Sequence, residues 1–231
     1  MRGVNTYDTF HAVITHAMSN PVSPDAIIAT GDLVQDETRT GYEHFRKSLE
    51  NYKLPVYCIP GNHDSPAKMV EVLDSPPFQV GGYVQLGNWT VILLNSFSSG
   101  DDGGRLSASE LLRLRETLAA NKFSHTLICI HHHPVAMGSR WLDGVALRNS
   151  DEFFDIVEKY PQVQGILWGH VHQTSDRQRK GVRLLSTPST CSQFLPNSDN
   201  FALDGQLPGY RWLVLRSNGT IDTEVVWLEN I

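Results

Sequence analysis

Four short apolar stretches of this sequence each end in polar residues of the kind that bind metal ions. The stretches are residues 26–30, 55–59, 126–130 and 163–168. Each has the length and composition of one buried strand. The polar residues that follow them are Asp32, Asn62 with His63, His131 with His132, and His170 with His172. In open α/β sheets, ligands bind outside the carboxyl ends of the strands, so we expect four strand ends of one sheet to meet at one site.

Helical and strand patterns alternate through the first two thirds of the sequence. Apolar residues at helical spacing predict helices at 6–18, 40–51, 66–73, 107–120 and 151–160. We expect two strands near 82–86 and 89–95. The last third is rich in strands, which we expect near 182–186, 210–216 and 221–228. This order predicts an α/β fold in which a sheet covered by helices is joined by a second sheet. Because no repeat or linker interrupts the pattern, we expect residues 1–231 to form a single domain.

Composition and charge exclude several other kinds of protein. Hydrophobic residues make up 40% of the 231 residues and charged residues 19%, which is typical of a globular protein rather than a disordered one. A net charge of −6 argues against nucleic acid as the main partner. No apolar run approaches the roughly 20 residues of a membrane span. The three cysteines are far apart, so we expect reduced thiols in a cytoplasmic protein; the oligomeric state stays open.

Each polar group also has an ordinary structural explanation. Asp32 can be a turn residue or a helix cap, and the Gly-Asn pair at 61–62 is common in turns. The three histidines at 131–133 can be a surface cluster. His170 and His172 can converge on one point if their strand has ended, in a turn at Gly169. Four such groups, each at a strand end, favour a shared metal site.

The mixture of donor atoms indicates which metals and which chemistry to expect. Aspartate, asparagine and histidine together suit Fe, Mn or Zn better than Mg or Ca. One aspartate can bridge two ions through its two carboxylate oxygens. Two ions roughly 3.5–4 Å apart can hold a phosphate ester and generate the hydroxide that attacks it. The sequence therefore indicates a metal-dependent enzyme acting on phosphate esters.

Four motifs, in this order, resemble those of the binuclear metallophosphoesterases of the calcineurin-like superfamily. They are Gly-Asp at 31–32, Gly-Asn-His-Asp at 61–64, His-His-His-Pro at 131–134 and Gly-His-Val-His at 169–172. With the segment 138–149, the sequence is similar to the bacterial class III 3′,5′-cyclic-AMP phosphodiesterases. The resemblance implies a four-layer α/β/β/α sandwich. It also implies hydrolysis of cyclic AMP to 5′-AMP by attack of a metal-bound hydroxide.

The resemblance implies a metal-binding role for five residues. Asp32 resembles the carboxylate that bridges two metal ions. Asn62, His131 and His170 look like the remaining ligands of one ion, and His172 looks like a ligand of the other. In the run of three histidines the family places the ligand first, which is why His131 is selected.

The same resemblance implies the catalytic residues. His63 resembles the histidine that contacts the phosphate and protonates the leaving oxygen. Asp64 looks like its orienting partner, which would raise the basicity of the imidazole. The substrate contacts implied by the family are Asn62, His63 and His172, and the substrate is a small phosphodiester.

The sequence departs from the family near its N-terminus. The family opens with a strand carrying Asp-x-His, which binds the ion that His172 shares, and no Asp-x-His occurs here. We expect the sequence to start late rather than to be a real truncation, so the predicted domain is incomplete and lacks its first strand. Made alone, this form is expected to bind one metal ion well at most and to have much reduced activity.

Two other functions remain open at this point. The same metal centre could hydrolyse another ester, such as a glycerophosphodiester or a nucleotide. A degenerate module that binds metal or nucleotide without catalysis is the other alternative, and the missing Asp-x-His favours it.

Overall fold

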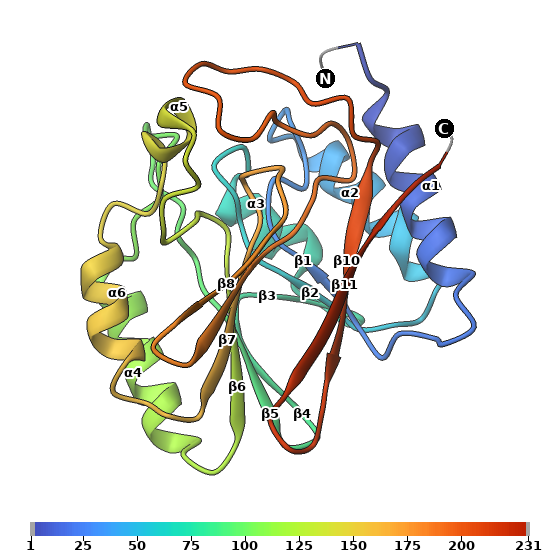
Figure 1. The fold of residues 1–231 in the computed structure, drawn as a ribbon. Coiled ribbons are helices and arrows are strands. Elements are labelled where there is room, and N and C mark those ends of the chain that lie inside the picture. Colours follow the sequence, from blue (N-terminus) through green and yellow to red (C-terminus); the bar gives the residue numbers. More distant parts are fainter. Residues whose placement is uncertain (1–2, 230–231) are drawn as a thin grey trace.

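The computed structural model describes residues 3–229 of the chain, which alternates helices and strands (Figure 1). The helices are α1 (Thr6–Met18), α2 (Arg39–Glu50), α3 (Pro66–Leu73), α4 (Ala108–Ala120), α5 (Arg140–Asp143) and α6 (Ser150–Val157). The strands are β1 (Ile27–Ala29), β2 (Val56–Cys58), β3 (Phe78–Val80), β4 (Gly82–Leu86), β5 (Trp89–Leu93), β6 (His125–Ile130), β7 (Val163–Trp168), β8 (Ser175–Arg179), β9 (Val182–Ser186), β10 (Gly209–Leu215) and β11 (Ile221–Trp227).

The strands form three sheets. A parallel sheet has the order β1-β2-β3, a mixed sheet has the order β4-β5-β6-β7-β9-β8, and β10 pairs with β11 in an antiparallel hairpin. The expectation that the four polar strand ends come from one sheet is wrong. β1 and β2 belong to the three-stranded sheet, whereas β6 and β7 lie side by side in the six-stranded sheet. Among the described residues, β1 pairs with β2 alone.

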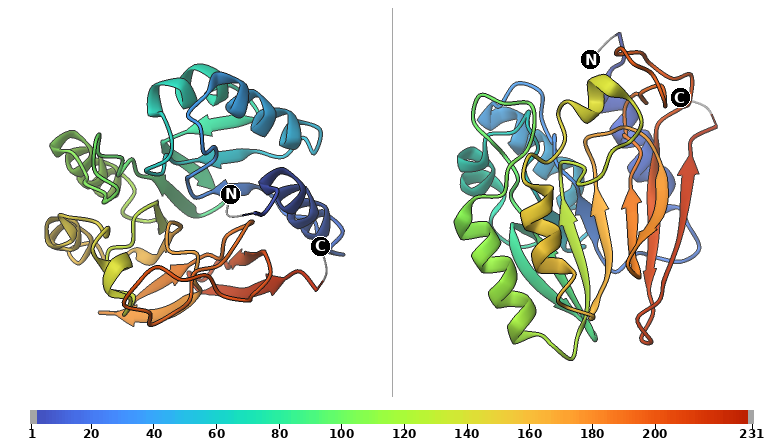
Figure 2. Two further views of the ribbon diagram at one scale, coloured as in Figure 1. Left: turned by 90° about the horizontal axis from the view of Figure 1, so that it is seen from above. Right: turned by 60° about the vertical axis from the view of Figure 1, so that its left-hand side comes forward.

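Three clusters of buried residues separate four layers. Val56 packs with α2 and α3, while its neighbour Tyr57 faces the other sheet. On β6, Leu127 lies in the same cluster between the sheets, and Ile128 packs with α4 and α6. Neighbouring residues thus face opposite sides of the sheet, as expected for a strand that is buried on both faces. Figure 2 shows the result from above, with α2 and α3 outside one sheet and α4 and α6 outside the other, which confirms the predicted α/β/β/α order.

Three elements were not expected from the sequence. β3 has three residues and directly follows two prolines, so it has no period to detect. α5 is a single turn. β8 reads Ser-Asp-Arg-Gln-Arg and is largely exposed, because it lies at the outer edge of the six-stranded sheet.

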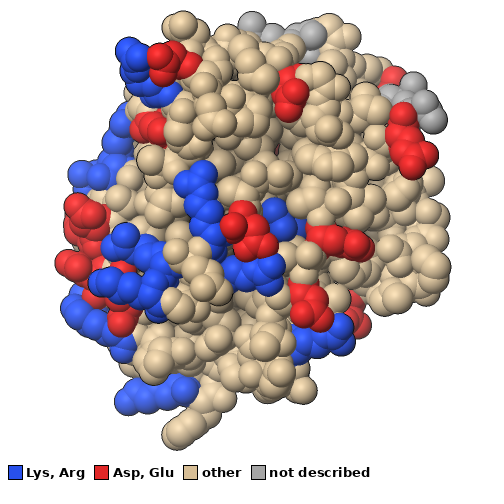
Figure 3. Space-filling view, in the orientation of Figure 1, with Lys and Arg blue, Asp and Glu red and all other residues tan. Residues whose placement is uncertain are grey.

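Charged side chains lie along this outer edge of the six-stranded sheet. Arg183 on β9 pairs with Asp176 on β8 at 2.6 Å, and Arg179 pairs with Glu158 at 2.8 Å. In Figure 3, Lys and Arg are interspersed with Asp and Glu on the face of the molecule that carries β8. Charged side chains on an edge strand discourage pairing with a second sheet. Within residues 3–229, no helix combines the length and the apolar character needed to cross a bilayer.

Candidate metal centre

Three of the predicted metal ligands surround a nitrogen atom of a fourth, His131 Nε2. The Asp32 carboxylate lies 3.3 Å from it, Asn62 Oδ1 lies 3.2 Å away, and His170 Nδ1 also lies 3.2 Å away. These residues follow β1, β2, β6 and β7. The ends of strands from two sheets thus bring two oxygen donors and two imidazoles to one point.

The protonation of His131 tests whether this group fits a cation. Its Nδ1 lies 2.7 Å from the Thr30 carbonyl oxygen, which can only accept, so Nδ1 carries the proton of a neutral ring. Nε2 then presents a lone pair toward the lone pairs of Asp32 and Asn62. Either a second proton on His131 or a metal cation is needed to hold these atoms so close. The donor set therefore fits a metal ion.

Electrostatics at His131 point the same way. Burial opposes a charge on this ring, but the Asp32 carboxylate, the Thr30 carbonyl and Asp64 together raise the pKa of His131. Burial alone would likewise raise the pKa of Asp32, but His131 holds it well below its usual range. For His170, burial and the neighbouring histidines lower the pKa, which favours the neutral ring. A neutral imidazole is the form that binds metal, and Nδ1 is the nitrogen of His170 that faces His131.

Three of the predicted ligands have a left-handed backbone. The φ angles are 55° for Asp32, 63° for His170 and 45° for His172. β7 ends at Trp168, so His170 and His172 both lie in the turn beyond the strand. In this turn the two imidazoles can point toward the same site, which they could not do within a strand. Residues other than glycine rarely adopt this left-handed conformation, and strained positions of this kind cluster at functional sites.

Two glycines allow the loops to approach closely. A Cβ at Gly31 would lie 2.3 Å from the His131 ring, and a Cβ at Gly61 would lie 2.1 Å from Asp32 Oδ1. Neither position can therefore hold a larger residue without displacing a predicted ligand.

His172 is held by contacts of its own. Its Nδ1 donates to the Ser192 carbonyl oxygen at 2.8 Å, and its ring stacks on Phe194 with centroids 4.1 Å apart. The hydrogen bond leaves Nε2 as the metal-binding nitrogen. Burial lowers the pKa of His172 to about 4, so the ring is neutral at pH 7.

His132 and His133 have different surroundings. Nitrogens of His131, His132 and His170 all lie within 4.8 Å of one another. However, His132 accepts from Ser96 Oγ at 2.7 Å and faces the Asp102 carbonyl at 3.2 Å, so both of its nitrogens already have protein partners. His133 is fully buried and stacks on His170 with centroids 5.6 Å apart. No periodic pattern in the sequence predicts these supporting roles.

Asp64 does not contact the imidazole that it was expected to orient. Its carboxylate accepts hydrogen bonds from the backbone of Gly61 at 2.9 Å and of Leu33 at 3.1 Å. The Tyr42 hydroxyl donates to it at 3.1 Å. Asp64 is completely buried, and burial raises its pKa to about 6. This carboxylate ties the loop after β1 to the loop after β2.

His63 lies at the junction of the same two loops. Its backbone N–H donates to Asp32 Oδ1 at 3.0 Å, which fixes the orientation of that carboxylate. Its ring Nδ1 lies 3.1 Å from Gln35 Nε2. No pattern in the sequence indicates this contact with Gln35.

A cluster of three aromatic rings lies next to His172. The rings of Trp141 and Phe201 meet Phe194 edge to face, each with centroids about 5 Å apart. Arg140 pairs with Asp199 at 2.5 Å, which joins α5 to the long loop between β9 and β10. Both segments lie at the upper end of the molecule in Figure 1.

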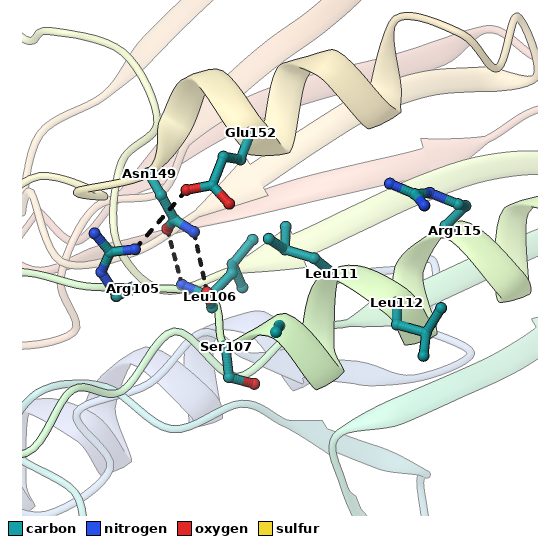
Figure 4. Close-up of a pocket in the computed structure, with 9 residues that line it drawn as sticks. Arg105, Leu106, Ser107, Leu111, Leu112, Arg115, Asn149 and Glu152 are labelled. Carbon is teal, nitrogen blue, oxygen red and sulfur yellow. Dashed lines mark hydrogen bonds and ion pairs between the residues drawn. The ribbon is translucent and has the colours of Figure 1, made fainter.

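A surface pocket elsewhere contains none of the predicted residues. It has a volume of about 390 Å³ and lies between α4 and α6. Asn149 closes one end by bonding the backbone N–H and carbonyl of Leu106, and Arg105 faces Glu152 beside it (Figure 4). The predicted metal ligands gather instead at the strand ends.

Comparison with known proteins identifies the family. The Calcineurin-like phosphoesterase family matches residues 3–174. The 3′,5′-cyclic adenosine monophosphate phosphodiesterase CpdA of Vibrio vulnificus is 43% identical over 223 residues, which cover 96% of this chain and 81% of the relative. CpdA of Escherichia coli K12 is 40% identical over 224 residues, covering 96% and 82%.

A solved structure shares the fold. The dimetal phosphatase from Danio rerio superposes with a TM-score of 0.64 at 10% identity, covering 96% of this chain and 88% of that one. The family match extends from α1 through the predicted ligands at the end of β7. The chain belongs to the calcineurin-like phosphoesterase family.

Proposed function

We propose that this protein is a metal-dependent phosphodiesterase that hydrolyses 3′,5′-cyclic AMP to 5′-AMP. The observation that carries the proposal is the similarity, over 96% of the chain, to relatives named as cyclic-AMP phosphodiesterases. The convergence of carboxylate, amide and imidazole on His131 supports it. Residues 1–231 act as one domain in this proposal, because one buried cluster joins strands of all three sheets.

Two metal sites share Asp32 in this proposal. Asn62, His131 and His170 complete one site, and His172 belongs to the other. This mixture of oxygen and nitrogen donors suits Fe, Mn or Zn. When bound, the ions supply Lewis-acid chemistry and lower the pKa of water.

The residues of the chain then orient the substrate and move a proton. Asn62, His63 and His172 contact the phosphodiester. As the bond from phosphorus to O3′ breaks, His63 gives a proton to O3′. The backbone N–H of His63 keeps Asp32 oriented throughout, through the bond to Oδ1.

Substitution of Asn62 or His170 by alanine tests the metal site. Each variant should lose bound metal at least about tenfold and lose activity with it, because a ligand is removed while the fold is kept. Metal content by mass spectrometry, cyclic-AMP hydrolysis and circular dichroism measure the three quantities. His44→Ala, on the exposed face of α2, is the matched control. Normal metal content with normal rates in either variant would contradict the assignment.

The choice of substrate is tested by relative rates. kcat/KM should be higher for cyclic AMP than for glycerophosphodiesters, with bis(p-nitrophenyl) phosphate as a reference for the metal centre itself. Faster turnover of a glycerophosphodiester would replace the proposed substrate. Binding of cyclic AMP without turnover in metal-loaded protein would instead indicate a non-catalytic module.

A further inference from the structure

The cluster of three aromatic rings extends outward from a predicted metal ligand. The Phe194 ring stacks on the His172 ring, with centroids 4.1 Å apart and an angle of 9° between the planes. Trp141 and Phe201 lie one ring further out, with centroids 5.2 Å and 5.3 Å from that of Phe194. The exposed fraction rises in the same direction, from 8% for Phe194 to 39% for Phe201. The cluster therefore joins the candidate metal centre to the surface.

We propose that the outer rings of this cluster, Trp141 and Phe201, bind the nucleobase of the substrate by stacking. This inference rests on the proposed function, in which His172 contacts the phosphodiester. In a cyclic nucleotide, only the ribose separates the phosphate from the base. In the protein, only the Phe194 ring separates His172 from the two outer rings.

The way in which the rings meet leaves aromatic faces uncovered. The planes of the three rings cross at 71°, 75° and 70°, so the rings meet edge to face and do not stack on one another. A nucleobase is flat, and it stacks on an aromatic face whatever polar groups it carries at its edge. Because a purine has a larger face than a pyrimidine, this surface should favour purine nucleotides.

The loop between β9 and β10, which carries two of the rings, is held in place by hydrogen bonds. The N–H of Phe194 donates to the His172 carbonyl oxygen at 3.1 Å. The N–H of Ser198 donates at 3.2 Å to the hydroxyl of Ser139, which is fully buried just before α5. A surface that is ordered before binding loses less conformational entropy when a ligand arrives, so the rings are suited to hold a base.

Binding without turnover tests the contact with the base. In the zinc-loaded protein, 5′-AMP should bind about tenfold more tightly than ribose 5-phosphate, which has the same sugar and phosphate but no base. Trp141→Leu and Phe201→Leu keep apolar volume without an aromatic face, and each should reduce this preference about threefold or more. Calorimetry measures the two dissociation constants. Equal affinities in the wild type, or an unchanged preference in both variants, would overturn the proposal.

Matched variants separate stacking from a structural role. Trp141→Phe keeps an aromatic face and should keep most of the preference for 5′-AMP. Phe123→Leu alters a fully exposed ring in the turn after α4 and should keep all of it. The zinc content should be the same in every variant, because neither outer ring is a predicted ligand. Loss of the preference in Phe123→Leu, or only together with loss of zinc, would overturn the role of the outer rings.

Steady-state kinetics provide the second test. Phe201→Leu should raise KM for cyclic AMP about fivefold with little change in kcat, because the base lies away from the reacting phosphorus. The rise in KM should be smaller for cyclic UMP, whose smaller base stacks less. A fall in kcat at unchanged KM would overturn the proposal, since the ring would then support the metal centre.

Failure of the proposed function would look different. A protein that prefers 5′-AMP to ribose 5-phosphate through the outer rings, but does not hydrolyse cyclic AMP, would remove the proposed reaction and keep the contact with the base. Hydrolysis of cyclic AMP without that preference would keep the reaction and remove the contact.

Discussion

The three-stranded sheet and the six-stranded sheet position their predicted metal ligands by different means. β1 and β2 have three residues each, and every side chain of β1 is only half-buried. β6 and β7 have six residues each, nearly all buried. Beyond the short strands, the loops are held by hydrogen bonds to Asp64. Beyond the long strands, the histidines follow strands that are packed in a large core, in addition to bonds such as that of His131 to the Thr30 carbonyl.

This difference indicates where the centre is vulnerable. Hydrogen bonds depend on single atoms, so one substitution can release Asp32 and Asn62 together. Packing is shared among many side chains, so the geometry of His131 and His170 survives the loss of one contact. We therefore expect the three-stranded side to couple stability to metal affinity, and the six-stranded side to keep them separate.

Asp64→Ala should give the largest effect. It leaves the N–H groups of Gly61 and Leu33 and the Tyr42 hydroxyl without their acceptor, and buried unsatisfied donors cost about 1–3 kcal/mol each. Since loss of the buried charge offsets part of this cost, we expect about 3 kcal/mol less stability in urea unfolding. Metal affinity should fall about 10-fold or more. Unchanged affinity would remove the contrast between the sheets.

Ile128→Ala should destabilise the six-stranded side without affecting metal binding. Ile128 is fully buried between β6 and the helices, and truncation of such a residue costs about 2–5 kcal/mol. Urea unfolding measures this loss, and titration with zinc under native conditions measures the affinity of the folded protein. A fall in affinity as large as that of Asp64→Ala would show that packing and ligand geometry are coupled here as well.

Tyr42→Phe should have a smaller effect of the same kind as Asp64→Ala. The hydroxyl of Tyr42 donates to Asp64 and accepts from the Ser65 N–H at 2.7 Å. Its removal should cost about 1–2 kcal/mol in the free energy of unfolding. Gly61 and Leu33 keep their bonds to Asp64. The loss of metal affinity in Tyr42→Phe should therefore be smaller than the loss in Asp64→Ala. Equal losses of affinity in both variants would contradict this ranking.

The smallest expected effect is a difference in labelling rate between two thiols, one in the three-stranded sheet and one in the six-stranded sheet. Cys58 on β2 and Cys129 on β6 are both fully buried, and burial raises the pKa of Cys129 to about 12 and also raises that of Cys58. Neither thiol should react with a thiol reagent in the native state. Rates of labelling during native-state opening should be faster for Cys58, because its sheet is smaller and is held by fewer contacts. Mass spectrometry of labelled peptides compares the two rates, and faster labelling of Cys129 would reverse the comparison.

The sequence was most informative where an apolar strand ended in polar residues. Such ends predicted that Asp32, Asn62, His131 and His170 share one site, and the alternation of elements predicted the α/β fold. It could not show that the strand ends come from two sheets, because buried strands look alike whichever sheet they join.

Contacts between loops were also beyond prediction. The bond between Gln35 and His63 joins residues 28 positions apart, and neither belongs to a periodic element. The role of Asp64 was implied by the family resemblance alone, and its hydrogen bonds with Gly61, Leu33 and Tyr42 follow no pattern in the sequence. The charged edge strand β8 escaped detection because it lacks an apolar face.

The left-handed backbone at Asp32, His170 and His172 restricts how this protein can evolve. At each position a side chain must satisfy the geometry of the turn before its chemistry matters. β-Branched residues are excluded by backbone sterics alone, whereas glycine and asparagine keep the turn but alter the donor atoms. In a library randomised at these three codons, survivors of selection for folding should therefore be richest in glycine, asparagine and aspartate. Selection for activity should then leave only the present residue at each position. Folding and catalysis thus restrict the residues allowed at the same three positions, one after the other.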